Sequence, residues 1–116
     1  MATFVLSLHS SPSLLTSAQA LFRFASAALK LGHRIDCVFF YQDAVYHAQT
    51  GLSLPSDQLN LGELWQGLKD HNISLFVCST AAEQRGVEVD TSRFNDAGLA
   101  EFAMKTSKAD RWVQFK

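Results

Sequence analysis

The chain has 116 residues and a mass of 12.8 kDa, the size of one domain, so we expect residues 1–116 to fold as a single unit. Hydrophobic residues make up 47% and charged residues 18%, a balance that excludes a disordered protein. The net charge of -1 offers no excess of Lys and Arg, which argues against direct binding of nucleic acid.

The first half of the chain alternates between strand and helix patterns. Thr3–Leu8 is a short apolar run with β-branched residues, which predicts a buried strand. Apolar side chains recur at helical spacing over Thr16–Leu31, and the glycine that follows is typical of a helix end. Arg34–Tyr41 is almost continuously apolar after its aspartate, which predicts a strand buried on both faces. A short helix over Asp43–Gln49, capped by its first residue, comes next.

The second half continues the alternation after an exposed loop expected over Thr50–Gln58. The further predictions, in chain order, are a helix over Leu61–His71, a strand over Ile73–Val77, a short helix over Thr80–Arg85, a polar, turn-prone stretch over Val87–Asn95, a helix over Ala97–Lys105 and a last strand over Asp110–Phe115. Strands that alternate with helices predict a parallel sheet covered on both faces. We therefore expect a three-layer α/β/α domain of flavodoxin-like architecture, with a mostly parallel sheet of about four to five strands.

In open sheets of this kind, function lies at the carboxyl ends of the strands. The segments at these ends are Leu8–Ser13, Tyr41–Asp43 and Cys78–Thr80. Cys78 directly follows a predicted strand and precedes a predicted helix, for which Ser79 or Thr80 is a good N-cap. Backbone N–H groups and the positive end of the helix dipole favour a thiolate at such a position. Cys78 is therefore a candidate nucleophile, and the alternative is a small buried hydrophobe.

Other polar residues near these strand ends have two interpretations each. His9 ends the first strand and can act as a base or stabilise a thiolate, or it can be a loop histidine held by a backbone hydrogen bond. Arg85 can bind an anionic partner or form a salt bridge. Cys37 lies in mid-strand, which favours core packing, with a role as resolving partner for Cys78 as the minor alternative. His47 is expected at the surface or at an interface.

Several classes of protein are disfavoured by missing patterns. Ser10–Thr16 has hydroxyls but no glycine, which argues against a flavin phosphate loop, and neither a Walker A lysine nor GxGxxG is found. The two cysteines form no CxxC pair, so a zinc site is not indicated. No apolar run approaches the roughly 18 residues that span a bilayer, and the first residues lack the positive charge of a signal peptide. We expect a cytoplasmic protein with reduced thiols and no membrane contact.

At these residues the sequence resembles the DsrE/TusD branch of the DsrEFH-like sulfur relay family, almost from end to end. The blocks that carry the resemblance are VFFYQDAVYHA at Val38–Ala48, LFVCSTAAEQRGV at Leu75–Val87 and DRWVQF at Asp110–Phe115. Two segments depart from the family pattern. The loop Ser10–Leu14 lacks the glycines that the family often has there, and Val87–Ala109 leaves room for one helix only.

The resemblance implies a sulfurtransferase that works as a persulfide carrier. The cysteine matching Cys78 accepts sulfane sulfur from an upstream donor protein and passes it to a downstream carrier protein, in tRNA 2-thiolation or in sulfur oxidation. From their positions near the strand ends, Ser79, Thr80, His9 and Arg85 are candidates for supporting roles. The family works as hexamers of paralogous subunits, so a hetero-hexamer is implied, with a homo-oligomer as the alternative. This chemistry requires no metal and no organic cofactor.

Two competing interpretations remain. The first is a non-catalytic scaffold subunit of a DsrEFH-like hetero-oligomer, in which Cys78 is buried. The second is a small-molecule thiol enzyme, which needs a pocket with convergent polar groups beside Cys78. For that pocket the sequence offers His9, Ser10, Ser79 and Thr80.

Overall fold

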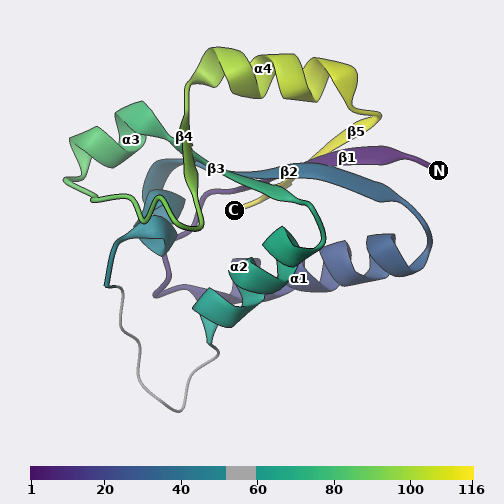
Figure 1. Ribbon diagram of the computed structural model, residues 1–116, viewed down its shortest axis with the longest axis horizontal. Coiled ribbons are helices and arrows are strands. Elements are labelled where there is room, and N and C mark those ends of the chain that lie inside the picture. The colour runs from purple at the N-terminus through teal and green to yellow at the C-terminus, as the bar shows by residue number, and fades with distance from the viewer. Residues whose placement is uncertain (52–59) are drawn as a thin grey trace.

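The computed structural model describes residues 1–51 and 60–116, which form a five-stranded sheet with helices on both faces (Figure 1). The strands are β1 (Thr3–Leu8), β2 (Arg34–Phe40), β3 (Ser74–Cys78), β4 (Asn95–Ala97) and β5 (Arg111–Phe115). The helices are α1 (Leu15–Lys30), the 3₁₀ helix η1 (Gln42–Ala48), α2 (Leu61–Asp70), α3 (Ser79–Gln84) and α4 (Leu99–Lys108).

The sheet has the strand order β4-β3-β2-β1-β5, and every pair of neighbouring strands is parallel. Parallel strands need a crossover between them, which the helices supply. Figure 1 shows α1 and α2 on one face of the sheet and α4 on the other. The three-layer α/β/α fold expected from the sequence is therefore confirmed.

The face covered by α1 and α2 holds most of the hydrophobic core. Phe40 of β2 is fully buried, and its ring meets the rings of Trp65 and Phe94 edge to face, at centroid distances of 5.0 and 5.3 Å. Helix α1 buries Leu21 and Ala25, residues on its apolar stripe. These contacts fix the strands against their helices, and so position the carboxyl edge of the sheet.

The opposite face is covered more thinly. Helix α4 has no buried residue, although its Phe102 stacks on Phe39 of the sheet at a centroid distance of 4.3 Å. Lys105 of α4 lies 6.0 Å from the ring of Phe76 and pairs with Asp36 at 3.6 Å. Helix α4 therefore rests on the sheet through a few aromatic and charged contacts.

The structure differs from the sequence-based expectations at several places. Strand β4 was not expected: it begins at Asn95, the last residue of the segment expected to be turn-prone, and ends at Ala97, where a helix was expected to begin. The buried Phe94 anchors this part of the chain, and β4 pairs with β3. Helix α4 consequently begins at Leu99 and not at Ala97. The short helix after β2 is 3₁₀ and begins at Gln42, and no side chain caps it.

The loop expected over Thr50–Gln58 lies, apart from its first two residues, outside the described residues. In the two described ranges, every helix is too short or too polar to cross a bilayer.

Candidate functional site

Cys78 lies where β3 ends and α3 begins, as the sequence predicted. It is the last residue of β3 and the N-cap of α3, and only 2% of its surface is exposed. The expectation that Ser79 or Thr80 caps this helix is wrong. Ser79 is the first residue of the helix and its hydroxyl donates instead to the carbonyl of Ala97 at 3.2 Å, because β4 lies alongside. Thr80 is exposed, and its hydroxyl makes no hydrogen bond within residues 1–51 and 60–116.

Residues of neighbouring strands line up at the carboxyl edge of the sheet. Cys78 pairs with Ala97 of β4, and the pairing of Val77 with Phe40 puts Tyr41 on the other side of Cys78. The pairing of Leu8 with both Phe40 and Phe115 continues this alignment beyond Tyr41. The full set, here called the edge row, is Lys116, His9, Tyr41, Cys78 and Ala97.

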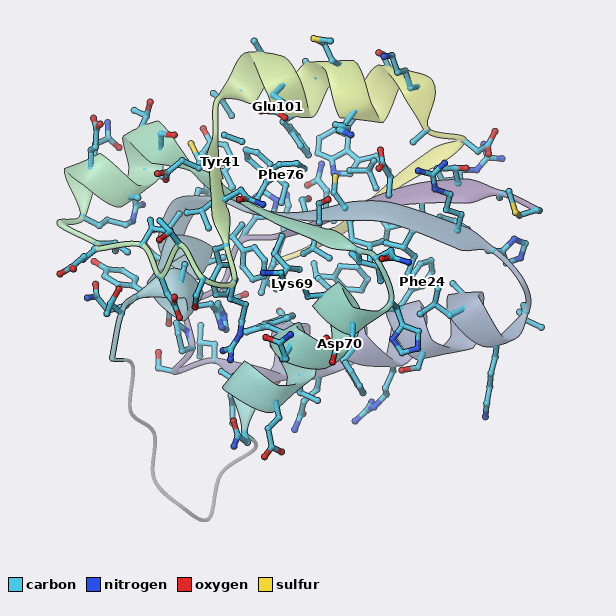
Figure 2. All side chains as sticks on the ribbon, viewed as in Figure 1. Phe24, Tyr41, Lys69, Asp70, Phe76 and Glu101 are labelled. Atoms are coloured by element: carbon cyan, nitrogen blue, oxygen red, sulfur yellow. The ribbon has the colours of Figure 1, made fainter. Side chains whose placement is uncertain are left out.

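The edge row lies on the face of the sheet that α4 covers. Side chains alternate between the faces of a sheet, so Tyr41 shares the face of Phe39, which stacks on α4. Figure 2 shows Tyr41 and Phe76 between the sheet and α4, whereas Phe24 lies on the opposite side. Cys78 follows Phe76 by two residues and shares its face. Reactive side chains are thereby placed on the face that is packed less tightly.

His9 is held by a chain of hydrogen bonds between side chains. Its Nε2 lies 3.1 Å from the Ser7 hydroxyl, and its Nδ1 lies 3.2 Å from Oε1 of Gln42. The indole Nε1 of Trp112 donates to the same Ser7 hydroxyl at 2.9 Å. Because Gln42 Oε1 accepts, Nδ1 carries the proton, and Nε2 accepts from Ser7. Burial lowers the pKa of His9, the hydrogen bond to Gln42 raises it in part, and the nearby charge of Lys116 lowers it further.

His9 does not touch Cys78. Two strand spacings of about 4.8 Å separate the two residues, and Tyr41 lies between them. The rings of His9 and Tyr41 are in contact, with centroids 5.9 Å apart and an angle of 33° between their planes. The sequence grouped His9 with Cys78 at one edge of the sheet, but Tyr41 was not singled out. Its place became evident only from the pairing of β2 with β3.

A pocket of about 410 Å³ opens at the same edge, beyond His9. Its lining consists of His9, Ser10, Ser11, Leu14, Gln42, Asp43, Gln114 and Lys116. Cys78, Ser79 and Thr80 are not among these residues. Convergent polar groups are therefore present, but Tyr41 stands between His9 and Cys78 in the order of the strands.

Arg85 forms an ion pair, which was one of its two interpretations. Its Nε donates to Asp43 Oδ1 at 2.9 Å, and its guanidinium also reaches the carbonyl of Ala81 at 3.3 Å. Asp43 was expected to cap its own helix. It binds Arg85 instead, and so ties η1 to α3 next to the edge row.

Cys37 behaves as a core residue. It is buried, and burial together with the charge of Asp36 raises the pKa of its thiol to about 12. It pairs with Ser74, four residues before Cys78, which is about 13 Å along a strand. A disulfide needs Cα atoms within about 7 Å, so Cys37 cannot resolve a bond to Cys78 in this fold.

His47 is buried and not at the surface, contrary to the expectation. Its Nε2 donates to the carbonyl of Ser10 at 3.1 Å, and its ring lies against those of Phe40 and Trp65. Burial lowers the pKa of His47 to about 4. No apolar periodicity indicated the burial of this residue, because a 3₁₀ helix of seven residues has too few turns to show one.

The chain is similar in sequence to a known protein family over almost its whole length. The sequence model of the DsrE/DsrF-like family matches residues 3–115. Sulfurtransferase TusD of Buchnera aphidicola is 37% identical over 108 residues, which cover 81% of this chain and 84% of that protein. A sulfurtransferase TusD homolog of Vibrio parahaemolyticus is 38% identical over 114 residues, covering 85% and 86%. The Klebsiella pneumoniae sulfurtransferase TusD is 34% identical over 112 residues, covering 84% and 88%.

Solved structures share the fold. The ychN protein of E. coli superimposes with a TM-score of 0.85 at 23% identity, covering 99% of this chain and all of that one. A Methanobacterium thermoautotrophicum protein of unknown function gives a TM-score of 0.77 at 11% identity, covering 98% and 99%. The family match over almost the whole chain, the relatives above 30% identity and the shared fold lead to one conclusion: this chain belongs to the DsrE/DsrF-like family.

Proposed function

We propose that the chain is a cytoplasmic sulfur relay protein that carries sulfane sulfur as a persulfide on Cys78. The observation that supports this most directly is the position of Cys78, at the carboxyl end of β3 where the N–H groups of α3 begin. The relatives named sulfurtransferase TusD support a role in sulfur transfer.

The proposed reaction balances without a metal, a cofactor or a redox partner. The Cys78 thiolate attacks the outer sulfur of a donor persulfide, R–S–SH. The new bond joins Sγ of Cys78 to that sulfur, the S–S bond of the donor breaks, and the donor leaves as the thiolate R–S⁻. The proton on the outer sulfur travels with it, giving Cys78–S–SH. A second thiolate, on the acceptor, then attacks the same outer sulfur and releases the Cys78 thiolate.

The neighbours of Cys78 have separate roles in this proposal. The bond from Ser79 to Ala97 holds the first turn of α3 against β4, and so fixes the backbone that follows Cys78. Thr80, two residues after Cys78, is exposed and in this proposal meets the incoming protein. Arg85 keeps α3 against η1 through Asp43. His9 acts from a distance, by holding Tyr41.

The proposed partners are proteins. An upstream protein donates the persulfide, and a downstream carrier protein receives it, in tRNA 2-thiolation or in sulfur oxidation. We propose assembly with paralogous subunits in a hetero-hexamer, with a homo-oligomer as the alternative. The net charge of -1 agrees with protein partners and not with direct binding of RNA.

The burial of Cys78 favours a second candidate function. A thiol with 2% of its surface exposed suits a scaffold subunit of a DsrEFH-like assembly as well as a carrier whose site must open. In a scaffold, Cys78 fills the core at the end of β3 and sulfur passes through another subunit.

Mass spectrometry distinguishes the two functions. The native protein is incubated with glutathione persulfide and then alkylated, and intact mass and peptide mass locate the added sulfur. A carrier gains 32 Da on Cys78, and Cys78→Ser loses this adduct. Cys37→Ser is the matched control and keeps it, because the Cys37 thiol, with its pKa of about 12, stays protonated at neutral pH. Sulfur on Cys37 alone, or on neither cysteine, contradicts the carrier and leaves the scaffold.

A further inference from the structure

The buried Cys78 and an open pocket lie at the same edge of the sheet. The pocket is lined by His9, Gln42 and Gln114, among others, and is open to solvent. In the edge row, Tyr41 is the residue between His9 and Cys78. Tyr41 does not itself line the pocket, but its ring contacts His9, which does, so Tyr41 lies behind His9 in the strand order that leads from the pocket to Cys78.

The backbone of Tyr41 is fixed. Its N–H donates to the carbonyl of Leu8 at 3.0 Å, and its own carbonyl accepts from the N–H of Ala44 at 3.0 Å. The first bond ties it to β1 and the second to η1. The part of Tyr41 that can move without a change in the sheet is therefore its side chain, which rotates about its own bonds.

Within residues 1–51 and 60–116, the ring of Tyr41 makes aromatic contacts with two neighbours. His9 lies beside it at a centroid distance of 5.9 Å, and Phe39 meets it edge to face at 6.3 Å. Both distances are within the range of a weak aromatic pair. His9 in turn is fixed by Ser7 and Gln42, so the pocket side of the ring rests on a rigid partner.

We infer that Tyr41 is a specificity-determining residue: its ring separates the pocket at His9 from Cys78 and limits by size the groups that reach the thiol. The pocket is then the access route to Cys78, and the group admitted is a slim sulfur electrophile, such as the terminal sulfur of a persulfide. The inference concerns access to the site of the proposed function. It is tested by thiol chemistry that needs no sulfur transfer, so either can fail without the other.

The test compares the alkylation rates of Cys78 with a small reagent, iodoacetamide, and a bulky one, N-phenylmaleimide. Tyr41→Ala removes the ring and is expected to raise the rate several-fold with the bulky reagent, which the ring excludes, and less with the small one. Tyr41→Phe keeps the ring and is expected to react like the wild type with both. His9→Ala frees one side of the ring and is expected to lie between wild type and Tyr41→Ala.

Cys37 serves as an internal control in every variant. Its thiol is buried in mid-strand and reacts only when the sheet opens. A rise in Cys78 labelling with Cys37 unlabelled reports access at the edge row, whereas labelling of both cysteines reports unfolding.

Filling the pocket tests the route itself. Gln114→Trp places a large ring in the pocket and is expected to slow the labelling of Cys78 several-fold. The matched control is Ser26→Trp, in a groove of similar volume between α1 and α2 on the other face, and it is expected to leave the rate unchanged. The inference is overturned if Tyr41→Ala changes both reagents equally or neither, if Tyr41→Phe behaves like Tyr41→Ala, or if the two tryptophan variants give the same rate.

Discussion

The two faces of the sheet are packed to different extents. On the α1 and α2 face, Phe40 and Trp65 are fully buried and meet edge to face. On the α4 face, the helix has no buried residue, and Trp112 of β5 is 44% exposed. The residues with reactive side chains, His9, Tyr41 and Cys78, all lie on the second face. The α1 and α2 face therefore has the denser hydrophobic packing, and the α4 face has the reactive side chains.

The largest expected effect comes from the tightly packed face. Phe40→Ala removes a ring that contacts Trp65, Phe94 and His47, and it should lower the free energy of unfolding by about 3–5 kcal/mol. Urea denaturation measures this loss. Phe40→Leu keeps most of the volume and should cost less than about 1.5 kcal/mol. An equal loss from Phe40→Ala and from the corresponding change on the α4 face would remove the contrast between the faces.

Acid should destabilise the same face through His47. Its pKa is about 4 in the folded chain against 6.5 when unfolded, so the unfolded chain binds more protons between these values. The stability from the neutral, buried ring is present above pH 6.5 and is lost as the pH falls towards 4, by about 3 kcal/mol. His47→Gln keeps a donor for the Ser10 carbonyl but does not titrate. Urea denaturation from pH 7 to 4.5 should show a shallower decline for this variant. Identical slopes would mean that His47 is not the group responsible.

The corresponding substitution on the α4 face should have a smaller effect. Phe102→Ala removes a stacking contact with Phe39 and an edge contact with Trp112, but the ring is partly exposed already. We expect a loss of about 1–2 kcal/mol in unfolding free energy by urea denaturation. Met104→Ala, on the exposed side of the same helix, is the control and should change stability by less than about 0.5 kcal/mol. A loss above about 3 kcal/mol for Phe102→Ala would show that α4 is packed as firmly as α1.

The smallest effect should come from the ion pair between α3 and η1. The Asp43 side chain is 61% exposed, so Asp43→Asn should cost less than about 1 kcal/mol, and salt should reduce the difference. A double-mutant cycle with Arg85→Met isolates the pair from other contacts. A coupling that persists unchanged in 1 M salt would argue against a simple surface ion pair.

Most of the fold could be predicted from the sequence. The apolar run at the end of β2 indicated a strand buried on both faces, and both Phe39 and Phe40 are buried. Strand β4 could not be predicted, because its three residues, Asn95–Ala97, are polar or small. Its strand conformation comes from pairing with β3, which is a tertiary effect.

The site was predicted less completely. The rule that strand ends meet at one edge brought His9 and Cys78 to the same edge of the sheet, and their segments do end there. It did not give their separation, since the order of the strands decides that Tyr41 stands between them. The degree of burial of Cys78 was likewise beyond local patterns, because it depends on neighbours from β2 and β4.

The pairing of β1 with β5 has a consequence for synthesis. β1 is made first, yet one of its two partners, β5, lies more than 100 residues later in the chain, as in the bond from Trp112 to Ser7. While the ribosome is still adding residues, that edge of β1 has no partner, and closing so long a loop is slow. Trp112, which donates to the Ser7 hydroxyl, and Gln114, which lines the pocket, both belong to β5. A nascent chain therefore contains Cys78 before the pocket beside His9 is complete.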